Sequence, residues 1–157
     1  MADDLKLINY GGILQFRMPC DWIEEYEEEG GAKFYEPHPD AGILRLNILT
    51  YRTPGPVSAT EISNLLAGMA RGRHEPVAIH ADGSMSIAAW ESGDEDGEPL
   101  AIRTWCIGSW VPPDCVRIAL FTYTMLESQR DHEAFTRDVA MIDREVRSCH
   151  FAERQGE

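Results

Sequence analysis

The sequence carries little positive charge. Only 14 of its 157 residues are Lys or Arg, against 27 Asp or Glu, so the formal net charge is −13 and the pI is near 4.7. Lysine is especially scarce, occurring as Lys6 and Lys33. Such a chain repels the phosphate backbone and anionic lipids. We therefore expect neither nucleic acid nor a membrane among its partners.

Long apolar runs and export signals are also missing. No stretch of ~18 consecutive apolar residues occurs, which excludes a transmembrane helix. The chain starts with acidic residues where a signal peptide is basic, and its first apolar stretch is interrupted at Asn9, Gly11 and Gly12. We expect a cytoplasmic protein.

The cysteines are few and form no Cys-x-x-Cys pair, which disfavours a zinc or redox motif. Free, buried thiols in a reducing compartment are the simpler interpretation. They are Cys20, Cys106, Cys115 and Cys149.

Catalytic and cofactor motifs are absent as well. The sequence has no Gly-x-Ser-x-Gly, no Gly-x-x-x-x-Gly-Lys and no Gly-x-Gly-x-x-Gly, and its five histidines lack metal-site spacing. The acidic loop that starts at Asp94 fails as a calcium loop, because Pro99 and Trp105 stand where Gly and Glu are required. A hairpin turn explains this loop better. We expect no cofactor and no metal.

His80 and Asp82 lie close in sequence to Ser84 and Ser86. Residues this near one another on a strand and its turn seldom align a nucleophile, a base and an orienting acid. We therefore assign no catalytic residue. An enzyme would have to use residues that are dispersed in the sequence.

Alternating apolar residues and turn signals predict short strands in the first third of the chain. Gly30 and Gly31 supply the turn of a hairpin between the second and third strands. The expected strands cover residues 13–17, 22–27, 32–36 and 43–51.

A helix is expected next. Ser58 and Glu61 have capping-box spacing, and Gly72 is the expected cap of a helix over about 58–71. One apolar stripe faces the sheet, formed by Ile62, Leu65, Leu66 and Met69.

A short strand at 76–80 and an antiparallel meander of strands at 85–91, 100–110 and 115–125 follow. The Pro112-Pro113 turn is expected to place Cys115 opposite Trp110. In that register one face carries Ala88, Trp90, Trp105, Ile107, Val116, Ile118 and Leu120, and the other carries Ile87, Ala89, Leu100, Ile102, Phe121 and Tyr123. Because both faces are apolar, both need cover.

The last helix shows the clearest periodicity, with a start expected at Ser128 or Asp131. Its apolar stripe consists of Phe135, Val139, Ile142, Val146 and Cys149. The opposite side has mixed charge and indicates solvated surface, with Arg130, Glu133, Arg137, Asp143, Arg144 and Arg147.

These elements predict one α+β domain over residues 1–157, with an ordered core of about 8–151. An antiparallel sheet of about six or seven strands would be flanked by helices as an α/β/α sandwich.

The element order, with the step Met18-Pro19-Cys20-Asp21-Trp22, resembles the PsbP-like fold group. That group includes PsbP, a Ran-binding import factor, DcrB-like proteins and type VI effector chaperones. The resemblance covers residues 13–151, and it implies a noncatalytic binding role by analogy of fold.

Six acids without a compensating base crowd the first hairpin, namely Asp21, Glu24, Glu25, Glu27, Glu28 and Glu29. They either dock a basic partner surface or form a solvated hairpin that protects a sheet edge.

Trp110, beside the Pro112-Pro113 turn, is a second candidate partner contact. Arg45, Asn47 and Arg103 interrupt apolar runs, so they lie near a strand edge or line a groove where cover is incomplete.

The sequence thus predicts a noncatalytic adaptor that binds a protein with a basic surface, with a chaperone for a secreted effector as one form. The alternative is a small enzyme or small-molecule binder that uses a pocket between sheet and helix. A homodimer formed through an exposed strand edge or sheet face is a further possibility.

Overall fold

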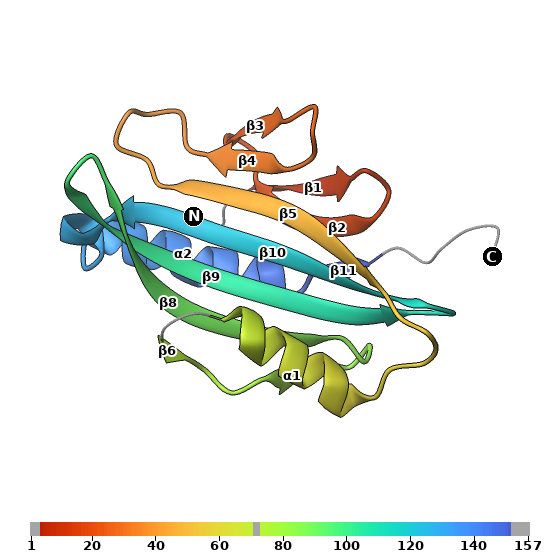
Figure 1. The fold of residues 1–157 in the computed structure, drawn as a ribbon. Coiled ribbons are helices and arrows are strands. Elements are labelled where there is room, and N and C mark those ends of the chain that lie inside the picture. Colours follow the sequence, from red (N-terminus) through yellow and green to blue (C-terminus); the bar gives the residue numbers. More distant parts are fainter. Residues whose placement is uncertain (1–3, 71–72, 152–157) are drawn as a thin grey trace.

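The computed structural model describes residues 4–70 and 73–151. A large antiparallel sheet forms its centre, in the strand order β3-β4-β5-β10-β9-β8-β6, and β7 also pairs with β8 (Figure 1). The strands are β3 (Ile23–Tyr26), β4 (Ala32–Tyr35), β5 (Ile43–Arg52), β6 (Arg73–His74), β7 (Ala78–Ile79), β8 (Met85–Glu95), β9 (Glu98–Val111) and β10 (Cys115–Leu126).

A second, three-stranded sheet was not expected as such. It has the order β1-β2-β11 and consists of β1 (Leu5–Tyr10), β2 (Leu14–Pro19) and β11 (His150–Phe151). Only β2 matches an expected strand. β1, β6 and β11 were missed, two of them because two-residue strands carry no alternation to detect.

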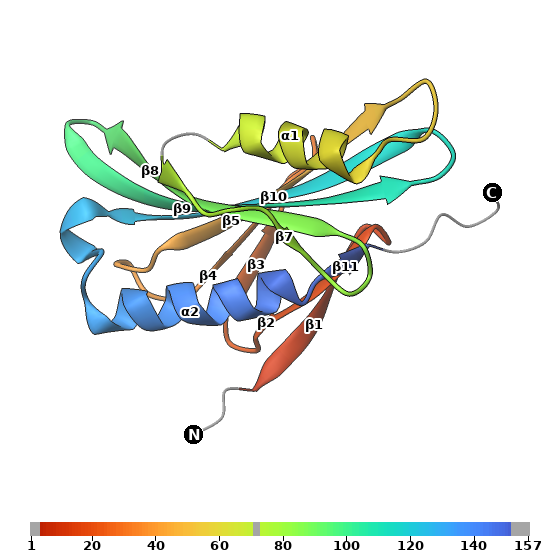
Figure 2. The same cartoon turned by 90° about the horizontal axis from the view of Figure 1, so that it is seen from below.

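Two helices lie on opposite faces of the large sheet, α1 (Ala59–Met69) and α2 (Glu133–Arg147) (Figure 2). The small sheet lies on the same side as α2. The predicted α+β fold, an antiparallel sheet with helical cover on both faces, is confirmed.

Helix α1 starts as expected. The Ser58 Oγ accepts a hydrogen bond from the Glu61 backbone N–H at 3.1 Å, and the Glu61 carboxylate accepts from the Ser58 N–H at 3.5 Å. The helix ends at Met69 with Ala70 as its C-cap. The expected cap, Gly72, lies outside the described residues.

Helix α2 starts later than expected. Residues 127–129 form a short 3-10 turn, η1 (Glu127–Gln129), which takes up Ser128, and the helix proper begins at Glu133 after the N-cap His132. Its apolar stripe is confirmed, because Phe135, Ile142 and Val146 are buried.

The expected register of β10 is wrong by one residue. Cys115 pairs with Val111 and Val116 with Trp110, so Pro112, Pro113 and Asp114 form the turn. A one-residue shift turns every side chain of a strand to the other face. Phe121 and Tyr123 therefore join Trp105 beneath α2, whereas Val116 and Ile118 join Ile87 beneath α1.

Three of the four cysteines are buried as expected, and Cys20 is exposed instead. Cys106 pairs with Leu120 across the ladder and Cys115 with Val111, so the two cysteines do not face each other. Burial raises the pKa of the Cys106 thiol to about 11, which keeps this sulfur protonated and unreactive.

Gly42 lies against the Tyr123 ring so closely that a substitution at Gly42 can test how the core is packed. A Cβ on Gly42 would lie 2.5 Å from the Tyr123 Cζ, and the Tyr123 side chain is buried. We expect Gly42→Ala to lower the unfolding free energy by about 1–3 kcal/mol, because a rigid ring must move. Urea unfolding measures the change. Gly55→Ala is the matched control, since a Cβ on Gly55 meets no atom within 4 Å. Equal midpoints for the two variants would contradict the packing.

Candidate functional site

The acidic hairpin is formed by β3, β4 and the turn between them, at one edge of the large sheet (Figure 1). Its tip carries Glu27, Glu28 and Glu29, all exposed. Glu25 on β3 is also exposed and accepts a hydrogen bond from the Tyr35 hydroxyl at 2.7 Å. The hairpin therefore presents its acids to solvent.

The expectation that no base compensates these acids is wrong for two of them. Lys6 on β1 lies 2.7 Å from the Glu24 carboxylate, and Lys33 on β4 lies 3.6 Å from Glu27. The hydrogen bond from Lys6 holds the pKa of Glu24 below its ordinary value. Both lysines of the chain are thus used here, and Glu25, Glu28 and Glu29 carry the hairpin's outward charge.

A pocket of about 230 Å³ adjoins the base of this hairpin. It lies between α2 and the segments that enter and leave the hairpin. Its lining consists of Pro19, Asp21, Trp22, Glu36, Ala134, Arg137, Asp138 and Met141. We call it the carboxyl pocket, because three carboxyl groups reach it from different parts of the chain.

Asp138 is the perturbed group of the carboxyl pocket. Burial and then the nearby Glu36 charge raise the pKa of Asp138 to about 7, opposed by the hydrogen bond from Tyr123 and the charge of Arg137. The Tyr123 hydroxyl donates to the Asp138 Oδ2 at 3.0 Å. The Glu36 carboxylate also lies 3.2 Å from the His38 Nε2. The pocket can therefore gain or lose charge near neutral pH.

Trp110 is not part of this surface. It pairs with Val116, which pairs with Tyr51 on β5, whereas the hairpin strand β4 pairs with β5 between Leu44 and Leu46. Its ring is half-buried against the core beneath α1. The structure thus does not bring Trp110 to the hairpin, and its role as a partner contact stays a prediction.

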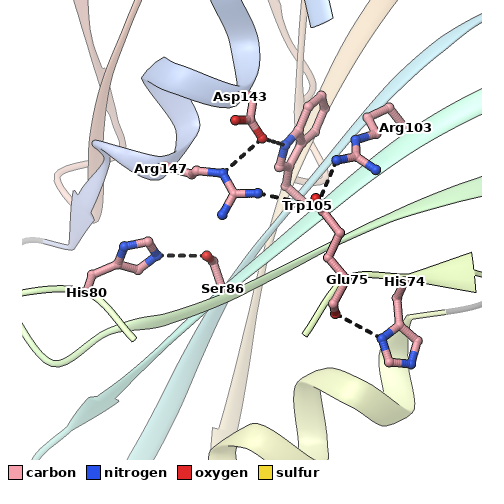
Figure 3. A network of polar contacts seen from close by, with 8 residues as sticks. All are labelled: His74, Glu75, His80, Ser86, Arg103, Trp105, Asp143 and Arg147. Atoms are coloured by element: carbon pink, nitrogen blue, oxygen red, sulfur yellow. Dashed lines mark hydrogen bonds and ion pairs between the residues drawn. The ribbon is translucent and has the colours of Figure 1, made fainter. Parts of the chain in front are cut away.

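His80 does reach a serine. Its Nε2 lies 2.7 Å from the Ser86 Oγ, as Figure 3 shows. Asp82, however, accepts hydrogen bonds from the Ser84 hydroxyl at 2.6 Å and the Ser84 backbone N–H at 2.9 Å. Ser86 is also 2% exposed. The acid is engaged by a different serine and the Ser86 hydroxyl is shielded, so these residues do not form a hydrolytic triad.

A polar network joins α2 to β9 and the segment after β6 (Figure 3). The Asp143 Oδ1 accepts from the Trp105 indole N–H at 3.0 Å and from the Arg147 Nε at 2.9 Å. The Glu75 Oε2 accepts from Arg103 at 2.9 Å and from Arg147 at 3.4 Å. The expectation that α2 turns Asp143 and Arg147 to open solvent is therefore wrong.

Of the polar residues that interrupt apolar runs, Asn47 is exposed on β5 just beyond its pairing with β4, as expected for an edge position, whereas Arg103 on the central strand β9 fits neither expectation. Arg103 lies inside the polar network, with its guanidinium 5.4 Å from the centroid of the Trp90 ring. Arg45 is half-buried, pairs with Lys33 on β4, and lines a second pocket of about 280 Å³ with Asp40 and Glu95.

Within residues 4–70 and 73–151, no group of three His, Cys, Asp or Glu side chains is arranged to hold a metal ion. Of the helices described, none is long and apolar enough to cross a bilayer.

The carboxyl pocket was not predicted from the sequence. Glu36 and Asp138 are about a hundred residues apart, and neither belongs to a motif. One weak feature of the sequence points to this pocket. Asp138 adjoins the apolar stripe of the last helix, and a carboxyl group that is buried beside such a stripe needs a hydrogen-bond partner.

Comparison with known proteins identifies the fold. No family model matches the chain, and no curated protein matches it in sequence. A crystal structure from Bacteroides thetaiotaomicron superposes on all of this chain, with a TM-score of 0.61 and 16% identity, although this chain spans only 51% of that one.

Two further solved structures are similar. Mycobacterium tuberculosis LpqN, involved in cell envelope biogenesis, matches with a TM-score of 0.57 and 9% identity over 88% of this chain and 83% of its own. The Saccharomyces cerevisiae Ran-binding protein Mog1p matches with a TM-score of 0.55 and 11% identity over 97% of both chains. At these identities the likeness concerns the fold, which is the PsbP-like fold that the element order resembles.

The raised pKa of Asp138 leads to a prediction for stability. The ordinary value is 3.8 and the folded value is about 7, so the folded chain binds this proton more tightly. The resulting stabilisation is complete at low pH and is lost as the pH rises through 7. Asp138→Asn cannot ionise but keeps an oxygen for the Tyr123 hydroxyl. We expect the wild type to lose more unfolding free energy than Asp138→Asn between about pH 5 and pH 8.5.

Urea unfolding at several pH values measures this difference. Asp131→Asn, on an exposed residue just before α2, is the control and should follow the wild type. Parallel pH profiles for the wild type and Asp138→Asn would show that Asp138 is ionised throughout.

Proposed function

We propose that this chain is a noncatalytic, single-domain binding protein that receives a basic segment of a partner on its acidic hairpin and carboxyl pocket. The observation that carries the proposal is the continuity of the two features. Asp21 precedes the hairpin and Glu36 follows it, and both line the pocket. A partner that lies along the hairpin can thus reach the pocket with one cationic side chain.

The chemistry of the pocket suits an ammonium or guanidinium group. Three carboxyl groups supply acceptors, and the Trp22 ring, which stacks on Tyr123 with centroids 6.5 Å apart, supplies an aromatic wall. Aromatic rings and carboxylates together favour cations. The exposed glutamates would attract the partner over a distance and so speed the encounter.

The names of the structural neighbours support a binding role without fixing the partner. Mog1p is a Ran-binding protein and LpqN takes part in cell envelope biogenesis. For this chain, an adaptor or a chaperone for a secreted effector fits the same surface. A cytoplasmic location remains a prediction from the sequence.

A small enzyme or small-molecule binder is the second candidate, and the same pocket favours it. A free amine would use the Asp138 and Glu36 carboxyl groups in place of a partner's lysine. The two candidates differ in their dependence on the hairpin tip, because a small amine in the pocket does not touch Glu28 or Glu29.

A homodimer through the β3 edge, where Ile23 and Tyr26 are exposed, is testable by light scattering.

The hairpin is tested by charge reversal. We expect the triple variant Glu25→Lys, Glu28→Lys, Glu29→Lys to weaken binding of a Lys-rich peptide at least tenfold, because it reverses the charge that Lys6 and Lys33 leave uncompensated. Calorimetry at low and high salt measures the loss, and wild-type affinity should fall as salt rises.

The control variant Glu95→Lys, Glu98→Lys, Asp131→Lys makes the same change of net charge elsewhere on the surface. This control distinguishes binding at the hairpin from attraction of the peptide by the overall negative charge of the chain. If both variants weaken binding equally, the hairpin is not the docking surface. If full-length partners captured from the host remain bound to the hairpin variant, the proposal is wrong.

The pocket is tested by pH. Asp138 becomes charged as the pH rises through about 7, so affinity for the Lys-rich peptide should increase between pH 6 and pH 8. Asp138→Asn should remove most of this increase. His38→Gln is the companion variant, because the His38 ring lies 3.2 Å from the Glu36 carboxylate that lines the pocket. An unchanged pH profile in Asp138→Asn would exclude the pocket from binding.

A further inference from the structure

Arg103 is a charged side chain held largely away from water. It lies on β9, where its side chain is 11% exposed. Its guanidinium carbon lies 5.4 Å from the Trp90 ring centroid and 5.8 Å from that of Trp105. Its Nε is buried and has no hydrogen-bond partner among the described residues. A buried guanidinium that leaves a donor unused is costly for stability alone.

The Glu75 carboxylate accepts a hydrogen bond from the Arg103 guanidinium on the side that faces solvent. The Glu75 carboxylate is 53% exposed and stands on the segment between β6 and β7. One of its oxygens, Oε2, accepts from both Arg103 and Arg147 (Figure 3). Two guanidinium groups from different elements thus converge on one carboxylate oxygen at the surface.

Arginines and carboxylates are balanced around this pair. Arg130 stacks on the Trp90 ring at 4.1 Å and is paired with Glu127 at 3.8 Å, so three arginines meet three carboxylates, Glu75, Asp143 and Glu127. Among these carboxylates, Glu75 is the one that pairs with Arg103. The Trp105 indole and Arg147 both bind Asp143, which fixes the guanidinium of Arg147 in position.

We propose that Arg103 and Arg147 form a binding site for a carboxylate from another molecule, and that Glu75 occupies this site as an internal competitor. The ligand is an Asp or Glu side chain of an acidic peptide segment. Arginine pairs favour planar carboxylates, and Glu75 shows that a carboxylate fits here. Only the Glu75 side chain needs to turn aside, because the Glu75 backbone N–H stays bonded to the Ala88 carbonyl at 2.9 Å.

The proposal is independent of the acidic hairpin, since the two sites would bind ligands of opposite charge and share no residue. The competing explanation is that the network simply fastens the segment after β6 to α2. On that explanation, removal of Glu75 lowers stability and creates no affinity for a ligand. The two explanations therefore predict different results for the same variant.

The test uses the full chain with Glu75→Ala and a five-residue peptide that contains three Glu, at about 0.15 M salt so that long-range repulsion is screened. Trp90 and Trp105 report binding by their fluorescence. We expect Glu75→Ala to bind the peptide about five- to tenfold more tightly than the wild type, because the site is no longer blocked for most of the time. Adding Arg147→Gln to Glu75→Ala should abolish the gain.

Glu98→Ala is the matched control, since it removes one negative charge from an exposed position on another hairpin. The Gln counterpart of the peptide and inorganic phosphate are the ligand controls. The proposal is overturned if Glu75→Ala binds no better than Glu98→Ala, if Arg147→Gln keeps the gain, or if phosphate binds and the peptide does not. A thermal melt of each variant establishes that it is folded.

Discussion

The packing of α2 against one face of the large sheet is the constraint on which the rest of the structure depends. Phe135, Ile142 and Val146 are buried there against strands of both sheets. Burial of such side chains stabilises the fold by roughly 1.5–3 kcal/mol each. The same packing fixes how α2 is rotated about its axis, and this rotation decides which polar residues reach which neighbours.

The rotation of α2 gives the helix two polar flanks with different partners. Asp138 and Asp143 are five residues apart, which is about 140° around a helix. Asp138 therefore faces Tyr123 and the carboxyl pocket, whereas Asp143 faces Trp105 and Arg147. Glu145, on the pocket side, is buried and paired with Arg17 at 3.2 Å, which joins this flank of α2 to β2. One apolar stripe thus positions both candidate sites.

The fold could be predicted from sequence because its signals are local. Alternating apolar residues predicted the long strands, and the spacing of Ser58 and Glu61 predicted the start of α1. The two apolar faces of the sheet predicted that both faces are covered. The register of β10 could not be predicted, because the Pro112-Pro113 segment allows turns of different length and nothing in the strand itself distinguishes them. Since both faces of β10 are apolar, a shift by one residue leaves the pattern equally acceptable.

The sites were less predictable because they consist of residues that only the fold brings together. The acidic hairpin was visible as a run of glutamates, yet its pairing with Lys6 depends on a strand that was not expected. The carboxyl pocket and the Arg103 network each combine several elements without a motif. The two candidate sites consequently lie on different flanks of α2, one lined by carboxyl groups and the other built on two arginines that share Glu75. The apolar stripe of α2 thus separates the site proposed for a cation from the site proposed for a carboxylate, so that one substitution can test either site without touching the other.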